Sequence, residues 1–228
     1  MITLKKDEDK IKTIVDYYIL TNKLKDVVRS GWRAWNVKRE RVESIAEHIY
    51  GTCMLAVAIW SETLPDINLS EVLTMLALHE TEEIIIGDIT PYDNEEKQKI
   101  KANGEKAVEA IFKNLIAKDV YFKLIHDFDT GATKEAIFAK KCDKLEADLQ
   151  ARLYSDEGSL KYEYAGEIKS NKDIEKLREK AGDDIADMFC EYDKKHFEDS
   201  DDIFLKINKY LKGNKILKNK KGKKWKIF

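Results

Sequence analysis

Residues 77–91 read Ala-Leu-His-Glu-Thr-Glu-Glu-Ile-Ile-Ile-Gly-Asp-Ile-Thr-Pro. A segment with apolar residues at helical spacing runs into this stretch, and the pattern ends at the adjacent pair His79-Glu80. The Gly87-Asp88 step predicts a loop soon afterwards. An imidazole and a carboxylate side by side at the end of an apolar helix are donors that suit a divalent metal ion.

The same two donor types recur at His48 and Asp143, on other segments with helical patterns. His48 lies 31 residues before His79, and Asp143 lies 63 residues after Glu80. Such separations suit a helical fold whose core brings distant turns together, and they do not suit a zinc finger. The alternative is that the histidines are hydrogen-bonded core residues and that the aspartate pairs with a lysine.

Composition favours an all-α protein. Charged residues make up 37% of the 228 residues, and both prolines precede residue 92. Residues 212–228 hold eight lysines and no acid, which leaves a net charge of −10 on residues 1–211. An acidic body argues against a specific nucleic-acid partner. We expect one helical domain over 1–211 and a basic, flexible tail over 212–228.

The three cysteines are far apart and form no CxxC pair, which is typical of reduced thiols in a cytoplasmic protein. The sequence shows no N-terminal signal pattern and no apolar run near 18 residues, so we expect no membrane partner.

Ser44, with Glu47 three residues later, predicts a capping box at the start of the helix that carries His48. Ser70 is expected to cap the next helix. Residues 155–170 have no clear pattern, and no segment reads as a strand. Helices are expected at about 7–28, 44–60, 70–79, 94–117, 118–127, 133–154, 171–194 and 200–212.

Three segments together point to a family: Arg41-Val-Glu-Ser-Ile-Ala-Glu-His48, the stretch 77–91, and Lys141-Cys-Asp-Lys-Leu-Glu146. In order and spacing they resemble the HD-domain metal-dependent phosphohydrolases, and most closely the small 5′-deoxynucleotidase branch. The resemblance covers about residues 8–155. It implies an HD-domain helical bundle, to which residues 156–211 would add a C-terminal helical extension.

By motif position the resemblance implies that His48, His79, Glu80 and Asp143 bind one divalent ion per subunit. Mn, Co, Fe, Ni, Zn and Mg all suit these donors. The chain departs from the family at Glu80, where the family has aspartate. Glutamate is one methylene longer and can still reach a metal, but the change can equally mark a member with altered or lost activity.

The resemblance also assigns two catalytic acids. Glu83, one turn after His79, matches a glutamate that orients or deprotonates the attacking water. Asp88 matches a second acid near the scissile phosphate. The alternatives are that Glu83 forms a salt bridge with a neighbouring helix and that Asp88 caps a helix.

A phosphate monoester calls for an arginine, whose planar fork binds two phosphate oxygens. The family places one before the first ligand helix, and we expect Arg33 in this role, with Arg41 as second choice. Trp32 or Trp35 can stack on the base or sugar. The alternative is that both tryptophans anchor their segment to the core.

These expectations lead to a hydrolase that releases phosphate from (deoxy)nucleoside 5′-monophosphates, with a nucleotide as its small-molecule partner. The first alternative is a nucleotide pyrophosphate or triphosphate hydrolase. The second is a nucleotide-binding protein whose Glu80 has impaired catalysis. Analogy with the family also implies a homodimer.

Overall fold

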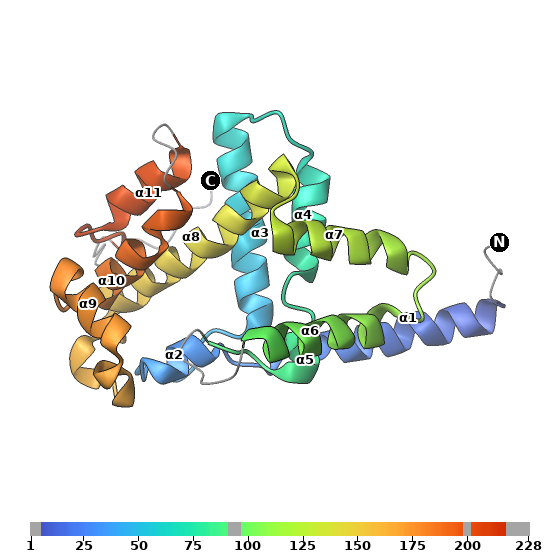
Figure 1. Ribbon diagram of the computed structural model, residues 1–228, viewed down its shortest axis with the longest axis horizontal. Helices are drawn as coiled ribbons and strands as arrows, with labels where there is room; N and C mark the ends of the chain where they lie inside the picture. Colours follow the sequence, from blue (N-terminus) through green and yellow to red (C-terminus); the bar gives the residue numbers. More distant parts are fainter. Residues whose placement is uncertain (1–5, 91–96, 198–201, 218–228) are drawn as a thin grey trace, which may run out of the picture. The chain divides into compact units, whose positions relative to one another are not determined.

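The computed structural model describes residues 6–90, 97–197 and 202–217, and it is helical (Figure 1). Within those residues there is no strand, only an isolated antiparallel bridge between Val28 and Ser44. No helix in these ranges is both long and apolar enough to cross a membrane. The expected all-α class is confirmed.

The chain divides into two compact units. The first comprises Met1–Ala34 and Glu40–Glu146, and the second comprises Trp35–Arg39 and Ala147–Phe228. The elements that begin in the first unit are α1 (Asp7–Thr21), η1 (Asn22–Lys25), α2 (Ser30–Ala34), α3 (Ile45–Thr63), α4 (Leu69–Leu78), α5 (Glu83–Ile86), α6 (Lys97–Phe112), α7 (Lys118–Thr130) and α8 (Lys134–Glu157).

In the first unit, α3 packs against α4, and α4 packs against α7. Figure 1 shows α1 running alongside α6, where Tyr17 and Leu20 contact a cluster of buried apolar residues. That cluster consists of Leu78, Val108, Ile111, Phe112 and Ile125. The buried apolar faces of these helices therefore place the ends of α3 and α4 beside the middle of α8, which carries Asp143.

The second unit contains the end of α8, then η2 (Tyr162–Tyr164), η3 (Glu167–Ser170), α9 (Lys172–Ala181), α10 (Ile185–Asp193), η4 (Lys194–His196) and α11 (Ile203–Leu211). Its buried side chains include Tyr154, Ile174, Ile185, Met188 and Phe197. The short segment Trp35–Arg39 joins this unit through the Lys38 amide, which donates to the Ser159 carbonyl at 2.8 Å.

The capping box at Ser44 is confirmed, because the Ser44 side chain accepts from the Glu47 amide and the Glu47 side chain accepts from the Ser44 amide. The cap expected at Ser70 is wrong. Asn68 is the N-cap of α4, and its side chain accepts from the amides of Ser70 and Glu71. An asparagine two residues upstream has a carbonyl oxygen that reaches both amides.

Two expected helices are shorter than the periodicity suggested. The first α-helix ends at Thr21 and continues only as the 3-10 turn η1. The helix expected over 171–194 is two helices, because Gly182 takes a left-handed φ of 77° that ends α9. Three predictions lie partly outside the described residues. They are the start of the helix expected over 94–117, the start of the helix expected over 200–212, and residues 218–228 of the expected tail.

Candidate metal centre

Three helices supply the four predicted donors. His48 lies in the first turn of α3, directly after the capping box, and Asp143 lies in the middle of α8. His79 is the C-cap of α4, and Glu80 follows it. All four belong to the first unit. One ligand atom from each lies within 4.8 Å of all the others, so the four side chains can hold a metal ion.

The individual distances match a shared cation. His48 Nε2 lies 3.0 Å from Asp143 Oδ1 and 3.8 Å from Glu80 Oε1. His79 Nε2 lies 3.5 Å from Glu80 Oε1 and 3.6 Å from Asp143 Oδ1. Ligands about 2.1 Å from one ion are about 3.0–3.4 Å apart in tetrahedral or octahedral geometry. The measured spacings are close to that range.

The tautomer of His79 leaves a lone pair facing the cluster. Its Nδ1 lies 2.7 Å from the Leu76 carbonyl oxygen, which can only accept, so Nδ1 carries the proton. Nε2 is buried and has no hydrogen-bond partner among the described residues. A buried nitrogen of this kind is costly to leave unpaired, and a cation would satisfy it.

Both ring nitrogens of His48 face carboxyl groups. Its Nδ1 lies 2.6 Å from Glu146 Oε2, and its side chain is fully buried. Burial, together with the charge of Arg29, lowers the pKa of His48 to about 3, so the imidazole is neutral. When the neutral ring donates from Nδ1 to Glu146, its Nε2 lone pair faces the Asp143 carboxylate. Two acceptors 3.0 Å apart favour a cation between them.

The residues present therefore fit a divalent ion. Acids outnumber basic groups around the donors, and this negative field also acts on His79. Burial alone would lower the pKa of His79, but Glu80 and Asp143 outweigh it and raise the pKa. Lys144 does pair with Asp143, at 2.8 Å from Oδ2. That contact uses the other carboxylate oxygen and leaves Oδ1 facing the imidazoles.

Glu83 begins α5 and lies next to the cluster. Its side chain is buried and hydrogen-bonded to Glu80, while Oε2 has no hydrogen-bond partner in the described part of the chain. Burial and then the negative charges of Glu80 and Asp88 raise the pKa of Glu83 far above its usual range. Within the described residues Glu83 forms no ion pair with a neighbouring helix, so its geometry favours the site over the salt-bridge alternative.

Asp88 follows Gly87, whose left-handed φ of 74° turns the chain back toward the start of α2. Asp88 Oδ2 accepts from the Ser30 amide, and the Ser30 hydroxyl donates to the Asp88 carbonyl at 2.8 Å. These are the contacts of a helix cap. Asp88 also acts electrostatically on Glu83 and Arg29. Its position therefore agrees with the capping alternative and keeps it near the cluster.

The arginine nearest the donors is Arg29. Its side chain is 20% exposed, and Nη1 lies 3.8 Å from Glu80 Oε1. Burial alone would lower the pKa of Arg29, but Glu80, Glu43 and other acids raise it, so the guanidinium remains charged. Arg33 is exposed, and among the described residues no hydrogen bond or ion pair joins it to the cluster. Arg41 forms a surface ion pair with Glu47 at 2.6 Å.

Both tryptophans are buried. Trp32 is 2% exposed and donates from Nε1 to Glu43 Oε2 at 2.6 Å. Trp35 is 1% exposed and belongs to the second unit, where its ring packs against Phe189 at 6.3 Å. Stacking on a base needs an open ring face, so the structure favours the alternative in which the indoles anchor their segments.

Arg29, Glu43 and Glu146 are the residues near the site that the sequence did not single out. Arg29 reaches the cluster because residues 27–29 pair with 43–45, with the Arg29 amide donating to the Glu43 carbonyl at 3.0 Å. No spacing along the chain distinguishes it from the other arginines of the segment. Glu146, three residues after Asp143, shares a helical face with it, which is a local signal.

Comparison with known proteins agrees with this geometry. The family model described as HD domain matches residues 21–183, a range that contains all four donors. The chain belongs to the HD domain family. This HD domain protein is 31% identical over 148 residues to 5′-deoxynucleotidase HDDC2 of Homo sapiens, covering 64% of this chain and 70% of that protein.

A second relative is 5′-deoxynucleotidase hdd1 of Schizosaccharomyces pombe, which is 28% identical over 168 residues. The aligned region covers 71% of the HD domain protein and 77% of the relative. The fold resembles a predicted metal-dependent phosphohydrolase from Magnetospirillum magnetotacticum MS-1, with TM-score 0.56 and 23% identity over 70% of this chain and 78% of that one. The PH0347 protein of Pyrococcus horikoshii OT3 superposes with a TM-score of 0.54 and is 22% identical. The match covers 80% of this chain and 97% of that one.

Proposed function

We propose that this protein is a metal-dependent phosphohydrolase that releases phosphate from (deoxy)nucleoside 5′-monophosphates. The observation that carries the proposal is the group of four donors, with the unpartnered His79 Nε2 among them and the charged Arg29 beside it. Relatives that match the chain over 64% and 71% of its length are named 5′-deoxynucleotidases, which supports the substrate class.

His48, His79, Glu80 and Asp143 would hold one divalent ion, and Mn, Co, Fe, Ni, Zn or Mg suit two nitrogens and two carboxylate oxygens. When bound, the ion supplies Lewis acidity toward a phosphoryl oxygen and lowers the pKa of water.

The remaining steps fall to the chain's own residues. Arg29 neutralises and orients the phosphate dianion, because its fork can donate to two phosphate oxygens. Glu83 would accept the proton of the attacking water through Oε2, because the charge of a bound ion offsets the negative charges of Glu80 and Asp88 that raise its pKa. The water oxygen bonds to phosphorus as the bond to the 5′ oxygen breaks. The proton then passes to that 5′ oxygen, which gives the nucleoside and inorganic phosphate.

The test is phosphate release from a panel of nucleoside and deoxynucleoside 5′-monophosphates by protein loaded with each ion in turn. Glu83→Gln is expected to lose about 10²-fold or more in kcat and to retain the wild-type metal content. His79→Gln is expected to lose the metal as well. A metal-loaded wild-type protein that releases no phosphate from any monophosphate would contradict the proposal.

Adding nucleoside triphosphates and nucleotide pyrophosphates to the panel separates the alternatives, because a monophosphate can release only orthophosphate. A nucleotide pyrophosphate or triphosphate hydrolase would release pyrophosphate or triphosphate in place of phosphate. The impaired-enzyme alternative is tested with Glu80→Asp. Because Glu80 Oε1 already lies 3.5 Å from His79 Nε2, we expect this variant to change kcat by less than about tenfold. An inactive wild type with an active Glu80→Asp variant would favour the impaired enzyme.

A further inference from the structure

The second ring nitrogen of His48 contacts a buried pair of carboxyl groups. Glu146 Oε2 lies 2.6 Å from His48 Nδ1, and the side chains of Glu43 and Glu146 are hydrogen-bonded to each other. Each of these two glutamates is only 7% exposed. Burying two acids side by side is costly, and the proposed reaction gives neither of them a step. Their contact with a candidate ligand indicates what they do.

The hydrogen bonds of this pair form a chain with a fixed direction. The indole N–H of Trp32 can only donate, so Glu43 Oε2 accepts from it at 2.6 Å. A hydrogen bond between two carboxyl groups requires one proton between them. The charge of Arg29 acts on both groups and disfavours a second proton on the pair.

The single shared proton decides the role of the Glu146 oxygen beside His48. If the proton belongs to Glu43, Glu146 is an ionised acceptor. If the proton belongs to Glu146, it is directed at Glu43. In both cases the oxygen that faces His48 accepts a hydrogen bond, and the imidazole proton therefore lies on Nδ1.

Gly51, in the interior of α3, allows Glu146 to come this close. His48 and Gly51 are three residues apart and therefore share one face of α3. A Cβ at Gly51 would lie 2.5 Å from Glu146 Oε1 and 3.1 Å from its carboxyl carbon. Glycine inside a helix is less stable than alanine. At this position its missing side chain leaves the space that the carboxylate occupies.

We propose that Glu43 and Glu146 are positioning residues, which hold the proton of His48 on Nδ1 so that its Nε2 lone pair faces the other three donors. The opposite tautomer carries a proton on Nε2 and cannot bind a cation there. This inference rests on the metal site of the proposed function. Partners that orient a ligating imidazole typically contribute about 10–100-fold to metal affinity.

The first test compares matched side chains at position 146 by calorimetric titration of the metal-free protein with Mn²⁺ and Co²⁺. Glu146→Gln is expected to bind each ion within about threefold of the wild type. Its amide oxygen can accept from Nδ1, and its amide N–H can donate to Glu43 in place of the shared proton. Glu146→Leu keeps the bulk without an acceptor and is expected to bind about 10–100-fold more weakly.

The second test displaces Glu146 without changing it. Gly51→Ala is expected to weaken binding of both ions by about 10–100-fold, because the added methyl group occupies the place of the Glu146 carboxylate. Gly104→Ala is the matched control. A Cβ at Gly104, in α6, would meet only ordinary contacts, the nearest at 3.7 Å, so its metal affinity is expected to equal that of the wild type.

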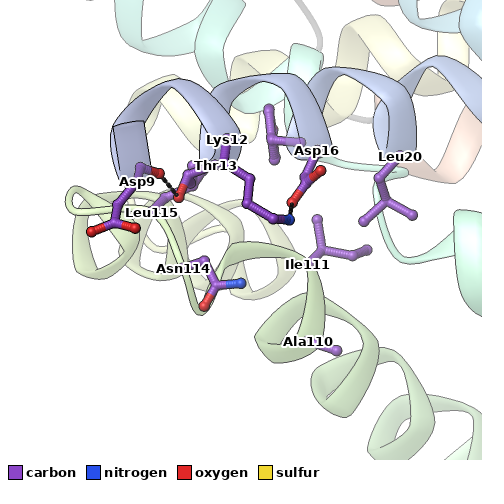
Figure 2. Close-up of a pocket in the computed structure, with 10 residues that line it drawn as sticks. Asp9, Lys12, Thr13, Asp16, Leu20, Ala110, Ile111, Asn114 and Leu115 are labelled. Atoms are coloured by element: carbon purple, nitrogen blue, oxygen red, sulfur yellow. Dashed lines mark hydrogen bonds and ion pairs between the residues drawn. The ribbon is translucent and has the colours of Figure 1, made fainter. Parts of the chain in front are cut away.

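A variant that only loosens the first unit separates affinity from stability. Figure 2 shows Ile111 on the wall of a cavity of about 380 Å³, which Leu20 of α1 also lines. Ile111 is buried in the apolar cluster and is not one of the donors. Ile111→Ala is expected to lower the melting temperature and to leave the affinity for both ions within about twofold.

The tautomer of His48 gives a readout that a loss of stability does not move. The ¹⁵N shifts of the metal-free protein are expected to show protonated Nδ1 in the wild type and in Glu146→Gln. In Glu146→Leu the proton is expected on Nε2, because Asp143 Oδ1, 3.0 Å away, is then the remaining acceptor for the ring.

The outcomes distinguish this inference from the proposed function. A wild type that binds neither ion would remove the metal site and the inference with it. If the wild type, Glu146→Leu and Gly51→Ala bind one ion equally well and keep the same tautomer, the metal site stands and the positioning role is overturned. A second bound ion that Glu146→Leu abolishes would make Glu43 and Glu146 ligands themselves, which also overturns that role.

Discussion

At the scale of single residues, the difference between Arg29 and Arg33 is one of burial. Both precede the first ligand helix in the sequence, but only Arg29 has its guanidinium among the acids of the site. Water screens a charge on an exposed side chain, whereas a largely buried guanidinium keeps its field for the phosphate. For the proposed function, the arginine best suited to bind the phosphate is therefore the one that the fold encloses.

We predict that Arg29→Lys lowers kcat/KM for a nucleoside 5′-monophosphate by about 10²-fold, because lysine keeps the charge and loses the fork. Arg33→Ala is the control and is expected to stay within about twofold. Steady-state kinetics on the metal-loaded variants, with melting temperatures to confirm folding, provides the measurement. A large loss in Arg33→Ala with normal activity in Arg29→Lys would return the role to Arg33.

At the scale of elements, α8, α10 and α11 meet in the second unit around two buried acids. Asp148 on α8 is fully buried, and its Oδ2 accepts from Asn208 Nδ2 of α11 at 2.7 Å. Asp193 ends α10 and is 4% exposed. Burial, and then the charge of Asp193, raises the pKa of Asp148 well above its usual range. The folded protein therefore holds a proton on Asp148 that the unfolded chain releases.

The sign of the pH effect follows from that proton. When the pKa of a group is higher in the folded protein than in the unfolded chain, its full contribution to stability is present below the unfolded-chain pKa, here about 4. The contribution is lost as the pH rises toward the pKa of the group in the folded protein. Above pH 4 the unfolding free energy of the second unit should thus fall, by at most about 1.4 kcal/mol per pH unit from this group.

Asp148→Asn is predicted to remove this dependence of the unfolding free energy on pH, because an amide has the shape of the protonated acid and cannot ionise. Urea unfolding at a series of pH values from 5 to 9 gives the comparison. Glu163→Gln, at an exposed acid of the same unit, is expected to keep the wild-type slope. An Asp148→Asn slope equal to that of the wild type would show that the Asp148 proton is not held.

At the scale of the whole molecule, the candidate metal site joins three helices of the first unit. An ion bound to the folded state alone stabilises it by RT ln(1 + [L]/Kd), about 4 kcal/mol at 1,000 times Kd. For a chain of this size, each kcal/mol shifts the melting temperature by about 2–4 °C.

We therefore predict that a chelator lowers the melting temperature of the first unit by roughly 8–16 °C, and that restoring a saturating divalent ion reverses the loss. His79→Gln should show no response to either treatment. Calorimetric melting with and without EDTA provides the check. Identical melting curves for the metal-loaded and chelated wild type would argue against a structural contribution from the ion.

The sequence by itself predicted most of the helices, the capping box at Ser44 and four candidate donors that the structure brings close together. Capping and helical periodicity are local, since they involve residues three or four apart. The same locality explains the misplaced cap: both Ser70 and Asn68 are capping residues, and only the backbone selects Asn68. The family resemblance rests on short segments of the same kind, and for that reason it identified the family before any contact was known.

Tertiary structure alone decided the surroundings of the donors. His48 meets Glu146 across 98 residues, and Ser30 meets Asp88 across 58. Burial of Trp32 and exposure of Arg33 depend on what packs over each side chain. These outcomes arise from many weak contacts between distant segments, and no spacing along a single chain encodes which of several similar residues they will enclose.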